Sequence, residues 1–136
     1  MTSGFVQFDV VAIAKYGLIK RGGSIILTAG TAAFAPNRKF SIRGALNGAV
    51  ISLTKGLAVD LAENGIRVNT VIPGPVETEL WDSAGTSKEL LGRKRFLVPF
   101  VGQPSDVAES YIYFLRADYS TGVTVVIDGG ELLVRK

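Results

Sequence analysis

The pattern of hydrophobic and polar positions predicts three short, buried strands. Apolar runs without polar alternation occupy residues 24–28 (SIILT), 66–72 and 124–127. Such runs are typical of parallel strands that are covered on both faces. Apolar positions at helical spacing fall between them, so helix and strand alternate along the chain. This order predicts an α/β fold with a parallel sheet, formed by one domain over residues 1–136.

Three helices are predicted, at about 5–20, at 41–63 and at 104–116. The longest has an apolar face formed by Leu46, Val50, Leu53, Leu57 and Leu61. It also carries a ridge of small residues, formed by Gly44, Gly48, Ser52 and Gly56. A glycine inside a helix costs about 1 kcal/mol relative to alanine, so the ridge predicts close approach of another backbone.

The composition restricts the chemistry and the partners. The chain has no cysteine and no histidine, which excludes disulfides, thiolate nucleophiles, imidazole bases and the usual zinc ligands. No metal site is therefore expected. The net charge of +3 comes without a long basic run, so no nucleic-acid partner is implied. No apolar run reaches membrane-spanning length and the start lacks the pattern of a signal peptide, so we expect a cytoplasmic protein without a membrane partner.

Residues 73–102 form a long irregular stretch, of the kind that is usually a functional lid or disordered. Glu77 and Asp82 follow its Pro-Gly turn and become candidate general bases if the stretch buries them. The alternative is that these carboxylates are solvated, as most loop carboxylates are. Trp81 either lines a pocket or packs in a core or interface.

Four motifs resemble the second half of a classical short-chain dehydrogenase/reductase: GGSIILT, KGLAVDLAENGIRVNTVIPGPVETEL, GQPSDVAE and TGVTVVIDGG. The resemblance extends from about Gly4 to Gly130. It implies a truncated Rossmann-like fold of about three parallel strands with helices packed on both faces. The glycine-rich turn that holds the dinucleotide pyrophosphate in that family belongs to its first half. The resemblance therefore implies no cofactor site in this chain.

The same resemblance implies that the catalytic positions have changed. The family's tyrosine and lysine, four residues apart on one helix face, correspond to Arg43 and Asn47, and its serine corresponds to Gly30. The asparagine of its proton relay corresponds to Gly4. Arginine stays protonated and an amide carries no charge, so neither can replace its counterpart. Arg43 is either an enolate clamp or a surface arginine, and Asn47 either binds a carbonyl group or caps a neighbouring group.

The loop after the first strand and the Pro-Gly turn contain the residues expected to bind a substrate. The expected ligand is a small apolar metabolite. The substrate-binding candidates are Thr31, Phe34, Pro73, Gly74, Thr78 and Trp81.

Three classes of function remain open. The first is a cofactor-independent isomerase, cyclase or lyase of metabolite biosynthesis that uses Arg43 and Asn47. The second is a non-catalytic binding or scaffold protein that pairs with itself or with a full-length relative. The third is an oxidoreductase completed by another chain. The small-residue ridge and the unpaired edge of strand 24–28 predict a homodimer or higher homo-oligomer, formed through the helices at about 5–20 and 41–63.

Overall fold

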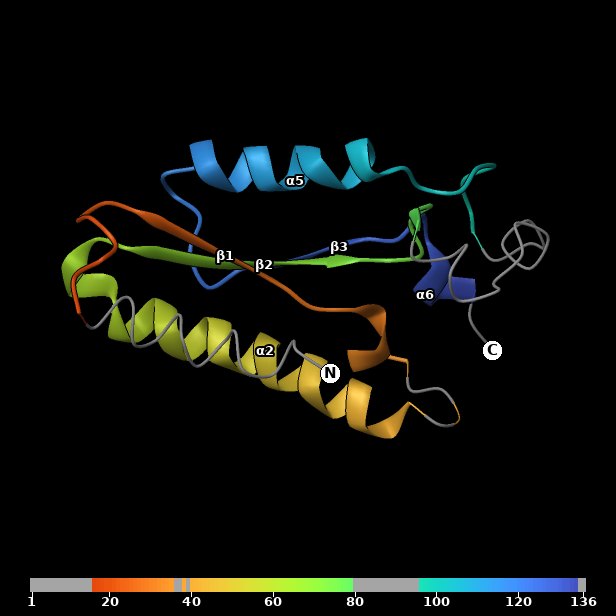
Figure 1. The fold of residues 1–136 in the computed structure, drawn as a ribbon, viewed down its shortest axis with the longest axis horizontal. Helices are drawn as coiled ribbons and strands as arrows, with labels where there is room; N and C mark the ends of the chain where they lie inside the picture. The colour runs from red at the N-terminus through yellow and green to blue at the C-terminus, as the bar shows by residue number, and fades with distance from the viewer. Residues whose placement is uncertain (1–15, 36–37, 39, 80–95, 135–136) are drawn as a thin grey trace.

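The computed structural model describes residues 16–35, 38, 40–79 and 96–134. Three parallel strands lie in the order β1-β2-β3, and Figure 1 shows them as a layer between α5 on one face and α2 on the other. This arrangement confirms the predicted α/β fold with helices on both faces of a parallel sheet. The elements are β1 (Ser24–Thr28), η1 (Thr31–Ala33), α2 (Ser41–Asp60), η2 (Ala62–Asn64), β2 (Arg67–Pro73), α5 (Pro104–Arg116), β3 (Thr124–Ile127) and α6 (Glu131–Val134).

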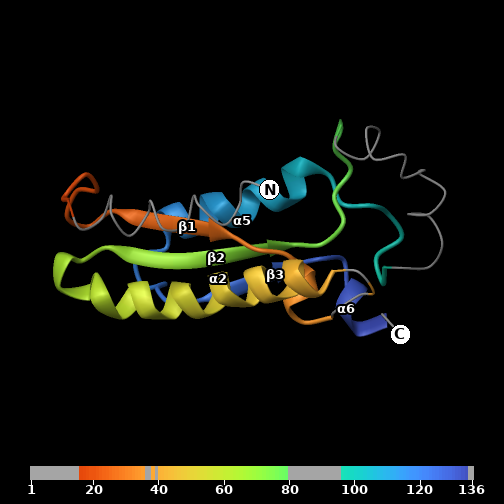
Figure 2. The ribbon, with the colours of Figure 1, turned by 60° about the horizontal axis from the view of Figure 1, so that its bottom comes forward.

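The middle strand β2 is buried and serves a separate hydrophobic core on each face. Val68 and Ile72 pack into the cluster beneath α2, which also contains Val50 and Leu57. The side chain of Val71, which lies between them in the sequence, instead packs with α5. Side chains alternate between the faces of a strand, so β2 supplies both cores. Figure 2 shows α2 running along the sheet beneath it.

The predicted bounds of the first strand (β1), of the helix at 104–116 (α5) and of the last strand (β3) are confirmed, whereas α6 was not predicted. The middle strand is shifted by one residue, to 67–73. The long helix ends at Asp60 rather than 63, because the chain tightens into η2 and then turns at Gly65, which has a φ of +65°. Left-handed backbone of this kind ends many helices.

Two predictions about the helices are wrong in part. Residues 5–15 of the first predicted helix lie outside the described residues, but residues 16–20 form turns and not a helix, since Gly17 has a φ of +69°. Leu46 was expected on the buried face of α2, yet 47% of it is exposed. The first turns of α2 pack on η1 through Gly44, so Leu46 is left at the surface.

The small-residue ridge of α2 has a partner at one of its glycines. A Cβ atom on Gly44 would lie 2.9 Å from the carbonyl oxygen of Ala32, so the predicted backbone approach is confirmed there and is made by the chain's own η1. Gly48 and Gly56 have no described atom within 4 Å of such a Cβ.

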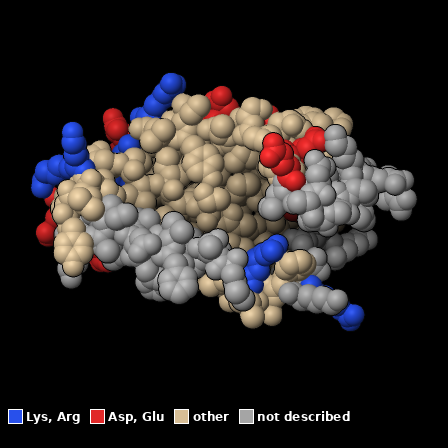
Figure 3. Space-filling view, viewed as in Figure 1, with Lys and Arg blue, Asp and Glu red and all other residues tan. Residues whose placement is uncertain are grey.

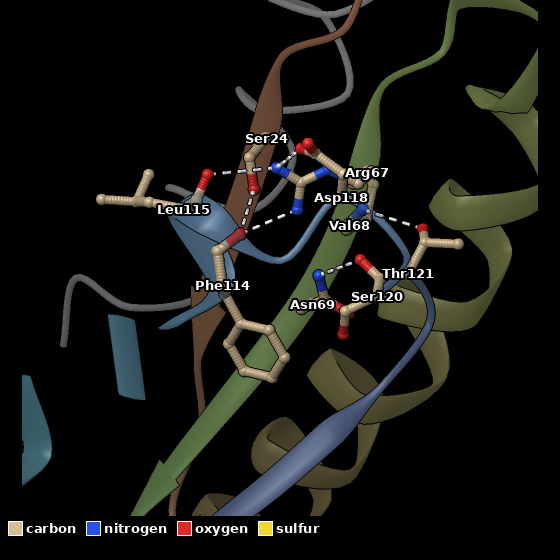
Figure 4. Close-up of polar contacts among 9 residues, drawn as sticks. All are labelled: Ser24, Arg67, Val68, Asn69, Phe114, Leu115, Asp118, Ser120 and Thr121. Carbon is tan, nitrogen blue, oxygen red and sulfur yellow. Dashed lines mark hydrogen bonds and ion pairs between the residues drawn. The ribbon is translucent and has the colours of Figure 1, made fainter. Parts of the chain in front are cut away.

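A network of polar contacts closes the amino-terminal end of the sheet (Figure 4). Arg67 donates to the carbonyl oxygens of Phe114 and Leu115, at 2.7 and 3.3 Å, and so caps the last turn of α5. Asn69 is fully buried; its amide donates to the carbonyl oxygen of Ser120 at 2.8 Å and accepts from the backbone N–H of Val123 at 3.1 Å. These bonds fix the turn that leads into β3. The described part of the chain contains no helix with the length and apolar character needed to cross a membrane.

Candidate functional site

The carboxyl ends of the three strands lie at the same end of the sheet, and the loops that follow them form the candidate site. Residues 29–34 follow β1, residues 74–79 follow β2 and residues 128–131 follow β3. In Figure 1 these segments lie at the right-hand end of the sheet. Ligands of open parallel sheets bind in the crevice outside the carboxyl ends of the strands, so binding is expected at this end of the sheet.

Helix α2 places Asn47 directly against Gly30. A Cβ atom on Gly30 would lie 3.1 Å from Asn47 Nδ2 and 3.6 Å from its Cγ. Gly30 precedes η1 in extended backbone, with φ −141° and ψ 159°, so its conformation does not require glycine. The structure thus brings together two of the positions singled out in the sequence. The amide of Asn47 can both donate to and accept from a ligand at this point.

Arg43 lies one helical turn before Asn47 and is exposed. Its Cζ lies 4.7 Å from the centre of the Phe40 ring, which is the geometry of a cation–π contact. This contact holds the guanidinium group beside the start of α2. A permanent, exposed positive charge therefore stands at the start of α2, one helical turn before Asn47.

Glu131 is a candidate that the sequence analysis missed. It begins α6, only 2% of it is exposed, and its Oε2 accepts a hydrogen bond from Thr31 Oγ1 at 3.5 Å. The chain turns back toward the carboxyl end of the sheet because Gly129 and Gly130 both have positive φ, at 62° and 83°. Asp128 fixes this turn, since its two carboxylate oxygens accept the backbone N–H groups of Gly130 and Leu132 at 2.8 and 2.9 Å. The Asp-Gly-Gly sequence was the available signal for this reversal.

The Pro-Gly turn packs tightly on the end of β3. A Cβ atom on Gly74 would lie 2.6 Å from both Cα and Cβ of Asp128. Three residues later, Glu77 is half-buried and its Oε2 accepts from Gln103 Nε2 at 2.9 Å. Glu77 therefore points toward the start of α5 and away from Asn47, which lies on the α2 side of the sheet.

The remaining sequence candidates are dispersed. Phe34 is 51% exposed and Thr78 is also exposed, so neither lines a closed cavity within the described structure. Trp81 and Asp82 lie outside the described residues. Among the residues that are described, no group of three His, Cys, Asp or Glu side chains is arranged to hold a metal ion.

Comparisons with known proteins agree with this architecture. The family model described as enoyl-(acyl carrier protein) reductase matches residues 3–131. The chain is 40% identical to glucose and ribitol dehydrogenase homolog 2 of Arabidopsis thaliana, over 97% of this chain and 47% of that protein. It is 37% identical to dehydrogenase/reductase SDR family member 4 of Homo sapiens, over 80% of this chain and 41% of that protein. The chain thus spans less than half the length of these relatives.

Solved structures of other proteins also superpose closely on this chain. A small-chain dehydrogenase in complex with NADPH superposes with a TM-score of 0.80 at 35% identity, over 91% of this chain and 58% of that one. The MalC reductase/Diels-Alderase from Malbranchea aurantiaca superposes with a TM-score of 0.83 at 33% identity, over 96% of this chain and 53% of that one.

Proposed function

Because the chain belongs to the short-chain dehydrogenase/reductase family, we propose that it is a divergent member that has lost NAD(P)-dependent redox chemistry. It acts instead as a cofactor-independent isomerase, cyclase or lyase on a small apolar metabolite. The contact between Gly30 and Asn47 carries this proposal. At the positions that correspond to the family's serine and lysine there is no hydroxyl group and no ammonium group, and an amide fills the space beside the missing side chain.

The side chains at the carboxyl end of the sheet support carbonyl chemistry without hydride transfer. Asn47 Nδ2 donates a hydrogen bond to a carbonyl oxygen, and Arg43 adds a positive charge where an enolate would form. Thr31 takes the proton that leaves the carbon next to the carbonyl as it passes its own proton to Glu131, along their hydrogen bond of 3.5 Å. Return of the proton to a different carbon completes an isomerisation, with no net oxidation or reduction. Loss of a leaving group from the enolate gives the lyase outcome instead.

One of the structural relatives is named for both a reductase and a Diels-Alderase activity. A Diels–Alder reaction forms a ring by rearranging bonds, without net oxidation or reduction. The similarity supports the proposal that this scaffold can host chemistry that needs no nicotinamide.

Deuterium exchange tests the proposed chemistry without knowledge of the natural substrate. The purified chain is incubated in D₂O with 2-methylcyclohexanone, cyclohexane-1,3-dione or phenylacetone, and loss of the proton next to the carbonyl is followed by NMR. We expect exchange above the buffer rate with no nucleotide added, and its loss in Thr31→Val and Glu131→Gln. Glu109→Gln, at an exposed position on α5, is the matched control and should exchange like the parent. Micromolar NADPH binding together with ketone reduction by the chain alone would overturn the proposal.

A second candidate function is that of a binding or scaffold protein, and the outer face of α2 favours it. Ile42 and Val59 on this helix are 77% and 76% exposed, and no described atom approaches Gly48 or Gly56. Close pairing with the same face of a second copy would cover these residues. Figure 3 shows a further uncharged area, on the side of the molecule where the edge strand β1 lies. An edge strand of this kind can pair with another chain, as the scaffold and completed-oxidoreductase alternatives both require.

A further inference from the structure

A pocket of about 250 Å³ lies at the amino-terminal end of α5, on the opposite face of the sheet from Asn47. Its walls come from four segments, one of which is the end of β3 with the turn that follows it. Val76 comes from the loop after β2, Val98 and Phe100 from residues 96–102, and Val107 from the first turns of α5. Val107 packs with Val71 in the core under α5, whereas Asn47 belongs to α2. The pocket therefore borders the loops after β2 and β3 but lies on the α5 face of the sheet, whereas Asn47 lies on the α2 face.

Hydrogen bonds hold the walls of this pocket in place. A parallel bridge joins Val76 to Gly102, and the backbone N–H of Glu77 donates to the carbonyl oxygen of Gly102 at 2.9 Å. Leu97 N–H donates to Gly129 O at 2.8 Å, which fastens residues 96–98 to the turn after β3. The space is thus a cavity between elements that are bonded to one another.

The size and lining of the cavity suit the apolar body of a small molecule. An engineered apolar cavity of about 150 Å³ is known to bind benzene, so 250 Å³ accommodates a substituted aromatic ring. The walls named above, together with Ile127, present mainly aliphatic and aromatic carbon.

Among the described residues that line the pocket, the charged ones are Asp106 and Asp128, and both are negative. The backbone N–H of Gln103 satisfies one carboxylate oxygen of Asp106, at 2.8 Å, and the side chain is exposed, so it remains accessible to a ligand. The start of α5 contributes a positive end equivalent to about half a charge, which is smaller than the two carboxylate charges that oppose it. The described part of the rim therefore favours a cation.

We propose that this pocket binds a small aromatic or aliphatic amine, with its hydrocarbon part between Val98, Phe100 and Val107 and its ammonium group at Asp106. An ammonium group at the rim keeps part of its hydration while it forms a charge-assisted hydrogen bond with the carboxylate. The apolar walls supply the remaining affinity by removing hydrocarbon from water. This proposal is independent of the reaction proposed for Thr31 and Glu131.

Three probes of similar size test the proposal: phenethylamine, phenethyl alcohol and phenylacetate. Each is titrated into the ¹⁵N-labelled chain, and amide shifts of Val76, Gly102 and Gly129 are followed by NMR. We expect all three amides to respond to phenethylamine, which should bind about five- to tenfold more tightly than phenylacetate, as a partly exposed ion pair allows. The proposal is overturned if phenylacetate binds as well as the amine, or if no probe shifts these amides.

Two variants separate the contributions of charge and apolar contact. Asp106→Asn keeps an oxygen acceptor for the Gln103 N–H and removes the charge, so it should weaken phenethylamine binding and leave phenethyl alcohol unchanged. Phe100→Ala should weaken both, and the 58% exposure of Phe100 makes it tolerable to the fold. Asp118→Asn is the charge-matched control, because that side chain is 97% exposed and lies at the other end of α5. An equal effect of Asp106→Asn on the amine and the alcohol would contradict the ammonium contact.

Discussion

The backbone of Gly30 and the side chain of Asn47 occupy complementary space: a methyl group added to Gly30 would lie 3.1 Å from Asn47 Nδ2. This distance is shorter than ordinary van der Waals contact, so a larger residue at Gly30 must displace the amide by a few tenths of an ångström. The end of an asparagine side chain can make that movement. The two residues are therefore expected to be coupled energetically.

Gly30→Ser should destabilise the chain by about 1 kcal/mol in the parent and by clearly less in an Asn47→Ala background. The physical reason is that truncating Asn47 removes the group with which the new side chain collides. Urea denaturation of the four members of this double-mutant cycle measures the coupling. Equal costs of Gly30→Ser in both backgrounds would show that the contact does not exist in solution.

Gly74→Ala should be among the most destabilising of the glycine substitutions. Its Cβ would lie 2.6 Å from Cα and Cβ of Asp128, and neither atom can move without shifting the turn after β3. We expect a loss of about 1–3 kcal/mol in the free energy of unfolding, as for other overpacked sites. Gly102→Ala is the matched control, since its Cβ would meet nothing closer than 3.6 Å. A comparable loss in the control would contradict the steric argument.

Asn69→Ala should cost about 2–3 kcal/mol, because it leaves the buried carbonyl group of Ser120 and the partly buried N–H group of Val123 without their partner. Thermal and urea denaturation measure this loss. Asp118→Ala, which removes only an exposed contact of 3.7 Å with Arg67, should leave stability unchanged. The prediction fails if the two substitutions have similar effects.

The buried hydroxyl pair of Thr54 and Thr70 predicts an asymmetry between two isosteric substitutions. Thr54 also donates to the carbonyl oxygen of Val50 at 2.8 Å, so Thr70→Val leaves Thr54 with a partner. Thr54→Val instead leaves the Thr70 hydroxyl group buried without its partner and should cost more, by about 1 kcal/mol. The double variant should be less destabilised than the sum of the single ones, as denaturation measurements would show. Additive effects would contradict a direct bond between the hydroxyl groups.

Gly48→Ala tests whether α2 pairs with a second copy of the chain. No described atom lies within 4 Å of the new methyl group, and alanine is favoured over glycine inside a helix by about 1 kcal/mol. In a homodimer formed through the ridge, the substitution should lower the dimer fraction measured by light scattering. Ile112→Ala, at a partly exposed position on α5 across the sheet from α2, serves as the control. An unchanged mass would exclude this face as the interface.

The sequence was sufficient for the elements whose limits are set by local chemistry. The strand at 24–28 starts after two glycines, and α5 begins at a proline whose preceding residue, Gln103, donates its N–H to Asp106. Exposure of Leu46 could not be predicted from periodicity, because it depends on where η1 packs. The burial of Glu131 could likewise not be predicted, since it follows from the path that two glycines impose on the chain.

The alternation along β2 has a consequence for how this sequence can diverge. Val71 belongs to the core under α5, while Val68 and Ile72 belong to the core under α2. A volume change on one face is absorbed by the helix on that face, and the backbone of β2 separates it from the other. The two layers can therefore accumulate substitutions at different rates, so a lineage can remodel the pocket at α5 while the surroundings of Asn47 stay constant.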